Sequence, residues 1–443
     1  MGITRGRAAP TRHSCRALAC PAQPRSRRHP AAQGPASRRR TTKGKRMRTS
    51  AALGNPDLFS EILYERMKRV NPGVADMELY EFRYALDNLY PTPGGWESVR
   101  VEPREAVERL VDSSAFYRGI QLKPQAGGRI VLDAAIVRLA QMLFVGLVTR
   151  AYPVAWVRAH FYFDIRGFFF LHRTTYFTAP VLAHLGRRPF QSFRQKQKRF
   201  ERCQDIGYRA FRAANAEVDQ AFIESVQKLI AAKGTPLLLA IAGPTAAGKT
   251  EIVARLRATL EESGRRVTSI EMDNFLTDRD AREERGIGSL GREAIHYPLF
   301  RQSLEDIRRG RKILIPRYDF VYATSSHDED GHLKPGCTPI EIEPADIVFI
   351  EGNFPFLLPE IAPLIDIKVV YLTDDAVRLK RKWKRDIDYR KKYEPTYFRN
   401  RFFREQFLMA EECYRPQMAA CDLLVDTTGA ALWATPEVAA LLG

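Results

Sequence analysis

The chain has 443 residues, 70 Lys and Arg against 52 Asp and Glu, and a formal net charge of +18. The excess is uneven: residues 1–50 contain 14 basic residues and no acid, which leaves +4 for residues 51–443. A nearly neutral remainder argues against a protein that binds polyanions over its whole surface. At ~150 residues per domain, the length predicts two or three domains.

The six cysteines are too few for a disulfide scaffold, and none forms the C-x-x-C pair that structural zinc sites use. We expect reduced thiols and a cytoplasmic location. The longest apolar run, residues 139–149, is closed by Arg138 and Arg150 and is too short to span a bilayer. We therefore expect a buried helix there and no transmembrane segment.

Residues 1–50 are rich in Arg, Ala, Ser and Pro and poor in large apolar side chains, so we predict that they do not fold. Three interpretations remain open. An organelle transit peptide fits the composition, although five prolines disfavour its amphipathic helix. A basic tail for nucleic acid or anionic lipid is the second. We favour the third, an extension upstream of a start at Met47.

Residues 51–224 are predicted to form a mainly helical accessory domain. Apolar residues recur there at helical spacing, as in Leu58, Ile62, Leu63 and Met67. The aromatic block at residues 161–170 (FYFDIRGFFF) predicts core or a helix–helix seam and not a ligand cage. The run at residues 187–202 predicts an exposed basic helix. No motif in this region indicates a chemistry.

After Gly234, short apolar runs alternate with helical stretches, which predicts βαβ units and a parallel sheet covered on both faces. The expected strands are residues 236–242, 267–272, 313–315, 347–350, 367–372 and 423–425, and the expected helices are 250–262, 299–309 and 376–391. The predicted fold class of residues 225–443 is therefore an α/β, P-loop NTPase-type parallel sheet flanked by helices.

The sequence GPTAAGKT matches the P-loop pattern G-x-x-x-x-G-K-[ST], follows an apolar run and opens a helical stretch. Such a loop wraps backbone N–H groups around a phosphate at a helix N-terminus. We expect Lys249 to reach the β- and γ-phosphates and the Thr250 hydroxyl to bind Mg²⁺. The predicted ATP-binding residues of the loop are Gly243, Pro244, Thr245, Ala246, Ala247, Gly248, Lys249 and Thr250.

Two acidic residues end predicted strands at the edge of the sheet where the P-loop lies. Glu351 ends the run IVFIE and should lie beside the metal ion. Asp273 follows residues 267–272 and should face the γ-phosphate, where it can take a proton from an attacking hydroxyl. Asp278 and Asp280 remain alternative bases. A basic stretch at residues 376–392, with Arg381 and Arg385, either closes over the triphosphate or is a solvated helix.

Over about residues 234–428 these motifs resemble the uridine kinase / phosphoribulokinase family of P-loop kinases. The motifs are GPTAAGKT, SIEMDNF, IPRYDF, IVFIEGNFPFLLPEI and RLKRKWKRDIDYR. The resemblance implies ATP with Mg²⁺ and γ-phosphoryl transfer to a hydroxyl of a small molecule. It assigns Asp273 and Lys249 to catalysis, Thr250 and Glu351 to the metal, and Tyr318 to the acceptor pocket. Lys382, Arg385 and Lys392 lie where the family has lid arginines, and Lys382 and Lys392 are expected to bind the acceptor.

Three departures from the nucleoside kinases of this family concern the acceptor. Leu276 replaces a tyrosine, residues 321–323 lack a pocket histidine, and residues 289–292 lack a ribose-contacting acid. A pocket without these polar groups should reject a nucleoside. Arg317, next to Tyr318, points instead to an anionic acceptor. His296 and His327 are possible substitutes, although a lone histidine is more often structural.

The predicted function is ATP-dependent phosphorylation of a small hydroxyl-bearing molecule. The alternative is a P-loop ATPase or nucleotide-gated module that regulates the helical domain. Asp273 distinguishes the two functions, because a kinase needs it as a base for the acceptor hydroxyl, whereas an ATPase needs a residue that positions water. Nucleic-acid binding through residues 1–50 and 187–202 is the least favoured interpretation. The sequence gives no indication of the oligomeric state.

Overall fold

The computed structural model describes residues 51–122, 132–164, 169–194, 208–287, 292–388 and 395–443. All of these described residues belong to one compact unit. Within the described ranges, no helix is long and apolar enough to cross a membrane.

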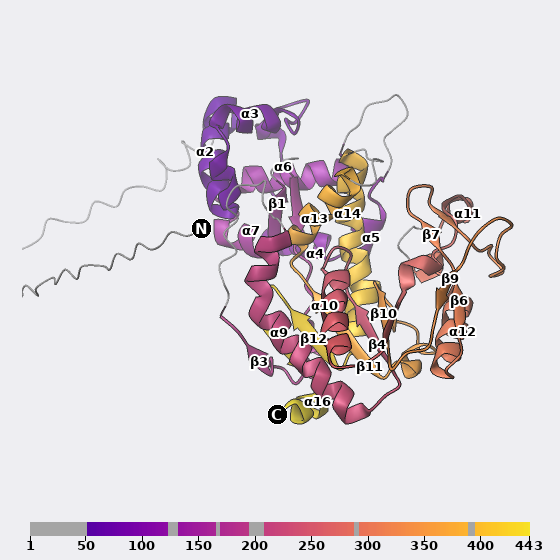
Figure 1. Cartoon of the computed structure of the whole chain (residues 1–443). Coiled ribbons are helices and arrows are strands. Elements are labelled where there is room, and N and C mark those ends of the chain that lie inside the picture. Colours follow the sequence, from indigo (N-terminus) through magenta and orange to yellow (C-terminus); the bar gives the residue numbers. More distant parts are fainter. Residues whose placement is uncertain (1–50, 123–131, 165–168, 195–207, 288–291, 389–394) are drawn as a thin grey trace, which may run out of the picture. The chain divides into compact units, whose positions relative to one another are not determined.

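The N-terminal half is helical, as its spacing predicts (Figure 1). Its helices are α2 (Pro56–Val70), α3 (Leu79–Asp87), α4 (Arg104–Val111), α5 (Ser114–Arg118), α6 (Ala134–Thr149), α7 (Val154–His160), α8 (Ala179–His184) and α9 (Tyr208–Lys233). Helix α6 contains the apolar run and is buried along most of its length, which confirms the expected buried helix. Asp133 caps it by accepting a hydrogen bond from the backbone N–H of Ala135 at 2.7 Å.

The described part of the aromatic block belongs to two paired strands and not to a helix–helix seam, and Phe161, Tyr162, Phe163 and Phe170 are buried in the core, as predicted; residues 165–168 lie outside the described residues. Strands β1 (Phe161–Asp164) and β2 (Phe169–His172) pair antiparallel. The ring of Phe170 lies 5.4 Å from that of Phe144 on α6. Aromatic side chains fit the pleated, half-buried surface of a strand, and tertiary packing on α6 decides the outcome here.

The prediction of a basic helix at residues 187–202 is wrong for the part that is described. Residues 187–194 are not helical and contain the short strand β3 (Gln191–Ser192), while residues 195–202 lie outside the described residues. Pro189 explains the difference, because proline disfavours helical geometry in the residue before it and has no N–H of its own.

A seven-stranded sheet forms the other half, in the order β3-β13-β12-β11-β4-β10-β5. Its longer members are β4 (Leu237–Ala242), β5 (Val267–Glu271), β10 (Ile347–Gly352), β11 (Ile367–Leu372), β12 (Leu423–Asp426) and β13 (Ala431–Ala434). The five strands from β12 to β5 are parallel, while at one edge β13 pairs antiparallel with β12, and β3 pairs antiparallel with β13. The predicted α/β fold with a mostly parallel sheet is confirmed.

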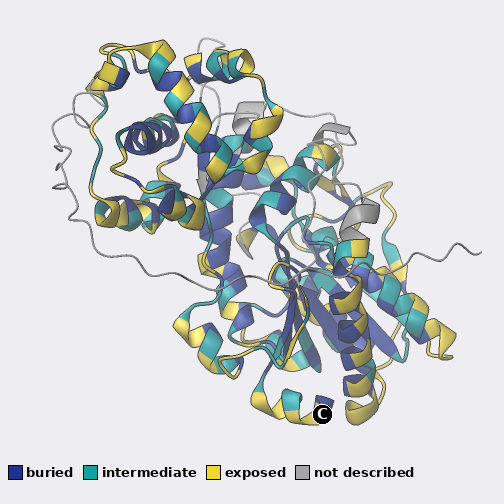
Figure 2. Ribbon diagram, turned by 90° about the vertical axis from the view of Figure 1, so that its left-hand side faces the viewer, coloured by how far each residue is buried: buried dark blue, intermediate teal, exposed yellow. Residues whose placement is uncertain are grey.

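Helices cover both faces of this sheet, because alternate residues of each strand point to opposite sides. Leu237, Leu239 and Ile241 of β4 pack with α9, α10 (Lys249–Glu262) and α16 (Pro436–Leu442). The alternate residues of β4, including Leu238, pack with α8 and α12 (Tyr297–Arg308). Figure 2 shows the strands as buried and the outer faces of the helices as exposed.

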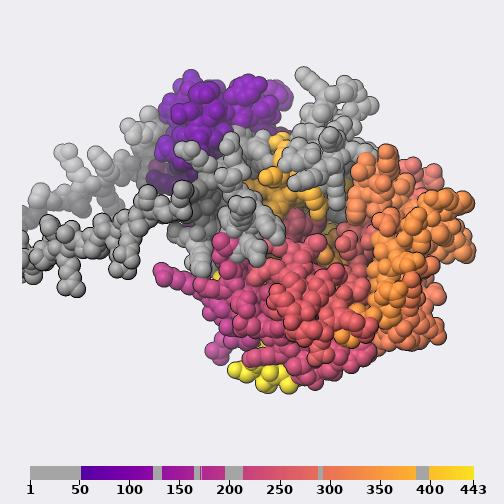
Figure 3. All heavy atoms as spheres, viewed as in Figure 1, coloured from indigo at the N-terminus to yellow at the C-terminus, as the bar shows by residue number. Residues whose placement is uncertain are grey.

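The expected strand at residues 313–315 forms, but outside the main sheet. As β6 (Ile313–Ile315) it pairs antiparallel with β9 (Ile340–Ile342) in a separate two-stranded sheet. Leu314 is 53% exposed, so this run has only one covered face and does not suit a doubly covered parallel sheet. Nearby lie α11 (Arg279–Glu284) and a hairpin of β7 (Tyr318–Asp319) and β8 (Thr324–Ser325). These elements gather at one side of the visible face (Figure 3).

The expected basic helix forms as α13 (Asp375–Asp388), and α14 (Pro395–Met409) follows it. Leu379 of α13 and Phe403 and Phe407 of α14 belong to the same hydrophobic cluster as the N-terminal helices. The N-terminal helices and these two helices therefore share one core. A domain boundary at 224/225 stays a prediction.

Candidate active site

The P-loop joins central strand β4 to helix α10, and its glycines are required by the backbone. A Cβ on Gly243 would lie 2.3 Å from the carbonyl oxygen of Tyr371 on neighbouring strand β11. Gly248 has a φ of +108°, which other residues rarely adopt. The loop can thus wrap closely against the end of β11 and direct the N-terminus of α10 at a ligand.

Lys249 lies buried in the centre of this loop. Its Nζ donates to the carbonyl oxygens of Gly243 at 2.9 Å and Pro244 at 3.1 Å, and to Asn353 Oδ1 at 3.3 Å. Burial lowers the pKa of Lys249, and the carboxylates of Glu351 and Asp273 oppose that change. Asn353 was not singled out from the sequence, although it lies only two residues after Glu351.

Glu351 lies where its position at the end of a strand predicts. It is in register with Ile241 on β4, which brings its carboxylate to the start of α10. Thr250 Oγ1 donates to Glu351 Oε1 at 2.5 Å. Burial raises the pKa of Glu351, while Lys249 and the Thr250 hydrogen bond lower it. A hydroxyl and a carboxylate oxygen in contact are the hard donors that suit Mg²⁺, so these residues fit that ion.

Asp273 follows strand β5, on the other side of β10, in the short helical turn Met272–Phe275. The carboxylate is partly exposed, and among the described residues it makes no hydrogen bond. Its charge acts on Lys249 and on Glu351, and it helps burial to raise the pKa of Glu271. The structure thus brings Asp273, Glu351 and Lys249 to one edge of the sheet.

The two alternative acids differ from Asp273 in their surroundings. Asp278 Oδ1 accepts from the backbone N–H of Ser325 at 2.6 Å, and its Oδ2 accepts from Lys334 Nζ at 2.6 Å. Both oxygens of Asp278 are therefore engaged: Oδ1 with Ser325 of β8, and Oδ2 with Lys334, which also donates to the Ser325 carbonyl at 3.0 Å. Asp280 lies exposed on α11.

Helix α13 lies against the P-loop with its basic face. Arg381 Nη1 donates to the carbonyl oxygens of Ala246 at 3.4 Å and Ala247 at 3.3 Å. Arg385 Nη2 donates to Thr245 Oγ1 at 3.4 Å. The interpretation of a purely solvated helix is therefore wrong for Arg381 and Arg385.

Arg378, one turn earlier on α13, was not singled out from the sequence. It is fully buried, and its Nη1 donates to the carbonyl of Thr245 at 3.4 Å. Its spacing to Arg381 and Arg385, three and seven residues, places all three on one helix face and was a usable signal.

A buried polar network ties Arg378 to the N-terminal half. Arg378 Nη2 forms an ion pair with Asp375 and donates to the Tyr176 hydroxyl at 2.8 Å. That hydroxyl donates to Asp375 Oδ1 at 2.7 Å and accepts from Gln406 Nε2 at 2.7 Å. Burial raises the pKa of Tyr176 well above its ordinary value, so the hydroxyl keeps its proton. The network fixes α13 on the segment that contains Tyr176.

The predicted acceptor-pocket residues have different environments. Tyr318 is buried, and its backbone N–H donates to Asn274 Oδ1 at 3.2 Å, directly beside Asp273. Arg317 is exposed. Lys382 is buried, 3.8 Å from the carboxylate of Glu405 on α14. Lys392 lies outside the described residues.

The two histidines have local partners. His296 Nδ1 accepts from the backbone N–H of Leu299 at 3.1 Å, which caps the start of α12. His327 Nδ1 lies 2.9 Å from Ser326 Oγ, and burial lowers the pKa of His327. The capping contact gives His296 a structural role.

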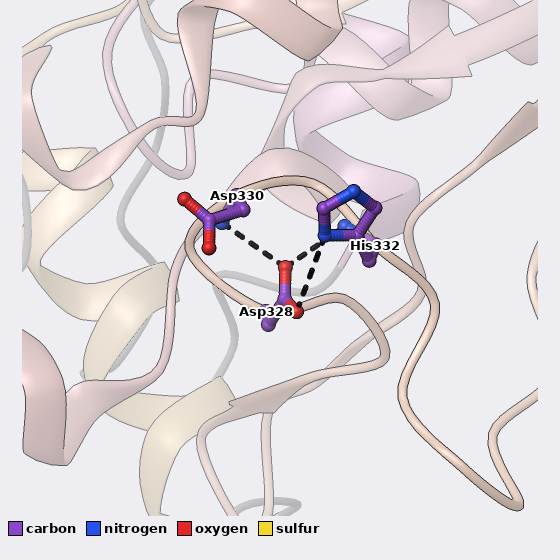
Figure 4. Close-up of side chains that lie close together, drawn as sticks. All are labelled: Asp328, Asp330 and His332. Atoms are coloured by element: carbon purple, nitrogen blue, oxygen red, sulfur yellow. Dashed lines mark hydrogen bonds and ion pairs between the residues drawn. The ribbon is translucent and has the colours of Figure 1, made fainter.

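Three exposed side chains, Asp328, Asp330 and His332, lie close together in the loop between β8 and β9 (Figure 4). Asp328 Oδ1 accepts from the backbone N–H groups of His332 at 2.8 Å and Asp330 at 3.0 Å. These bonds lower the pKa of Asp328. The turn's own hydrogen bonds account for the cluster, and no metal is assigned to it.

Residues 238–433 match the sequence model of the Phosphoribulokinase / Uridine kinase family. The chain is 30% identical over 156 residues to uridine kinase of Macrococcus caseolyticus, which is 34% of this chain and 70% of that protein. It is 29% identical over 160 residues to uridine kinase of Lactobacillus helveticus, 34% of this chain and 68% of that protein. It is also 30% identical over 153 residues to uridine-cytidine kinase A of Dictyostelium discoideum, 34% of this chain and 28% of that protein.

Two solved structures are similar in part. D-glycerate 3-kinase from Cryptococcus neoformans aligns with a TM-score of 0.36 and 16% identity, over 49% of this chain and 97% of that one. A structure described as a possible uridine kinase from Bacillus stearothermophilus aligns with a TM-score of 0.30 and 22% identity, over 41% of this chain and 94% of that one.

Proposed function

Because the chain belongs to the phosphoribulokinase / uridine kinase family, we propose that it transfers the γ-phosphoryl group of ATP to a hydroxyl of a small molecule. One observation carries the proposal. The P-loop lysine, a Thr–Glu pair that suits Mg²⁺ and the Asp273 carboxylate, which no described residue hydrogen-bonds, converge at one edge of the sheet. Phosphoryl transfer requires these three parts together.

The nucleotide side acts by binding and by charge. The backbone N–H groups of the P-loop and the N-terminus of α10 would hold the phosphates, and Lys249 would neutralise the oxygens of the β- and γ-phosphates. Arg381 and Arg385, which already contact the loop, add positive charge where the transferred group becomes more negative. Thr250 and Glu351 would hold Mg²⁺, which when bound neutralises phosphate charge.

Asp273 would act as the general base. The acceptor hydroxyl oxygen forms a bond to the γ-phosphorus as the bond to the β,γ-bridging oxygen breaks, ADP leaves, and the hydroxyl proton passes to an Asp273 oxygen. Asp273 suits this role because its oxygens are not engaged by described residues. Asp278, by contrast, has both oxygens engaged, one by the Ser325 backbone and one by Lys334.

We propose an acceptor other than a nucleoside. Leu276 offers no hydroxyl where nucleoside kinases of this family have a tyrosine, and its backbone forms a bridge with Ile295. A nucleoside would bury hydroxyl and base groups without partners on this side, which costs binding free energy.

A coupled assay of ADP formation tests the proposal. The full chain is incubated with ATP and Mg²⁺, alone and with nucleosides, ribulose 5-phosphate, pantothenate or glycerate. We expect ADP formation that depends on one non-nucleoside acceptor and a phosphorylated product in equal amount. ADP formation of equal rate without any acceptor would instead indicate the alternative function, a P-loop ATPase.

A further inference from the structure

We propose that Arg282 binds an anionic group of the acceptor, either a carboxylate or a phosphate; this inference rests on the proposed function. Arg282 lies on α11 and is only 2% exposed. Its Nη2 donates to the Tyr318 hydroxyl at 3.1 Å. Its Nε and Nη1 are buried without a hydrogen-bond partner, and no acid in the described part of the chain forms an ion pair with it.

A buried guanidinium that lacks an ion pair and has unpaired N–H donors is energetically unfavourable unless a ligand supplies the missing acceptors. Arginine stays protonated in proteins, so burial cannot neutralise it. A buried donor without a partner is destabilising because it loses its hydrogen bonds to water, and buried charges are normally paired. The Tyr318 ring, whose centroid lies 5.8 Å from the guanidinium carbon, offers weak attraction and no acceptor for Nε or Nη1. An oxyanion supplies both the missing charge and the missing acceptors.

The position of Arg282 connects this anion site with the reacting hydroxyl. Tyr318, its hydrogen-bond partner, is held through its backbone N–H by Asn274, the residue after Asp273. Helix α11 is fixed on the same hairpin, because the Arg279 N–H donates to the Ala323 carbonyl at 3.0 Å. A small molecule whose anion contacts Arg282 is thereby bound next to the proposed base.

The chemistry of arginine defines the acceptor class. Its planar donor fork matches carboxylate and phosphate oxygens. The acceptor therefore carries a hydroxyl and an oxyanion, as sugar phosphates and hydroxy acids do. Nucleosides, which carry no anion, lack the group that Arg282 requires.

Calorimetry on the full chain, with a non-hydrolysable ATP analogue and Mg²⁺ present, tests the inference. The anionic probes are glycerate, ribulose 5-phosphate and inorganic phosphate, and the neutral probes are glycerol and ribulose. We expect at least one anionic probe to bind, with a Kd raised at least about 10-fold by Arg282→Met and less by Arg282→Lys. Tighter binding of glycerate would indicate a carboxylate site, and tighter binding of ribulose 5-phosphate would indicate a phosphate site.

Arg285→Met is the matched control, because it removes the same charge from the end of the same helix. Arg285 is exposed and paired with Glu329, so its replacement should leave anion binding unchanged. Arg282→Met should also not lower Tm, since it removes an unpaired buried charge, whereas a purely structural arginine would lower Tm when replaced. If Arg282→Met fails to fold, Arg282→Lys decides, and an unchanged Kd for it overturns the inference.

The inference fails if no anionic probe binds, if neutral probes bind as tightly, or if Arg282→Met binds like the wild type. The two proposals can fail separately. Arg282-dependent anion binding without phosphorylation of any probe would contradict the kinase function and leave the anion site standing. Phosphorylation of a neutral alcohol at the same rate by the wild type and by Arg282→Met would contradict the anion site and leave the kinase function standing.

Discussion

The nucleotide side and the acceptor side of the site differ in how their cationic groups are held. Lys249 has three oxygen partners, and Arg381 and Arg385 already contact the P-loop. Arg282, on the proposed acceptor side, has one neutral partner, and two of its buried nitrogens have no hydrogen-bond partner among the described residues. The cationic groups of the nucleotide side are thus satisfied by internal contacts, whereas we propose that a ligand pairs the cationic group of the acceptor side.

This difference has a physical consequence for substrate choice. A P-loop made of backbone groups binds phosphates in any member of a fold class, because its donors are independent of side-chain identity. The acceptor side is built from a few side chains, each of which rejects molecules that leave it unpaired. Substrate identity should therefore follow from groups such as Arg282 and Leu276, and the predictions below test each side in turn.

The largest effect is expected for Lys249→Ala, which removes the buried positive charge of the nucleotide side. ATP turnover should fall to the background of the assay while Tm stays close to that of the wild type. Lys312→Ala, which removes an exposed lysine paired with Glu341 and Glu343, is the control and should keep full turnover. Turnover near the wild-type rate in Lys249→Ala would mean that the loop is not the nucleotide site.

Asp273→Asn tests the boundary between the two sides. Loss of the general base should lower kcat by about 10²–10⁴-fold, while the nucleotide Kd changes little because it depends on the P-loop. Asp278→Asn and Asp280→Asn should be measured beside it. The assignment is wrong if Asp273→Asn keeps its kcat and one of the other two loses it.

Glu351→Gln should weaken binding of the Mg²⁺-nucleotide by about 10–100-fold. Burial raises the pKa of Glu351, so the ligand-free fold binds more protons than the unfolded chain between the ordinary and the raised pKa. The free energy of unfolding should therefore fall as pH rises through that window, while Mg²⁺-nucleotide affinity rises with ionisation. Glu351→Gln should show neither pH dependence. The free energy of unfolding and the nucleotide affinity are measured between pH 4 and 8, with and without Mg²⁺. Wild-type pH dependence in Glu351→Gln would contradict this assignment.

Tyr176→Phe tests how firmly the nucleotide side is anchored to the N-terminal half. The change removes a hydroxyl that contacts Asp375, Arg378 and Gln406, and should lower the free energy of unfolding by about 1–2 kcal/mol. Tyr84→Phe, on a side chain that is 79% exposed, is the control and should change nothing. Equal stability of the two variants in urea would show that the network contributes no net stability.

Deletion of residues 1–46 is expected to have the smallest effect. The segment lacks the apolar side chains needed to dock on the folded unit, so kcat and KM should stay unchanged. Non-specific binding of polyanions should decrease, because 13 basic residues are removed. A loss of activity on truncation would instead mean that this segment contributes to the site.

Local patterns were enough to predict the sheet, the P-loop and the basic helix. The strand at Ile367–Leu372 has the predicted bounds, and α10 begins within one residue of its expected start. Glu351 and Asp273 were placed correctly at one edge because parallel strands end on the same side. Each of these features depends on residues close together in the chain, or on a rule that holds for all parallel sheets.

Tertiary structure alone decided the remainder. Leu314 shows that β6 is half-exposed and paired with β9, a contact that no local spacing encodes. The sequence contains Arg282 and Arg378 among many basic residues. The spacing of Arg378 to Arg381 and Arg385 indicates a shared helix face, but nothing nearby in the chain shows that either Arg282 or Arg378 is buried. Arg378 is buried with Asp375 and Tyr176, whereas Arg282 is buried with two nitrogens that no described residue pairs. Burial and pairing depend on contacts between segments distant in sequence. These contacts give Arg378 its partners in the fold, and they leave Arg282 as the group that we propose binds a ligand.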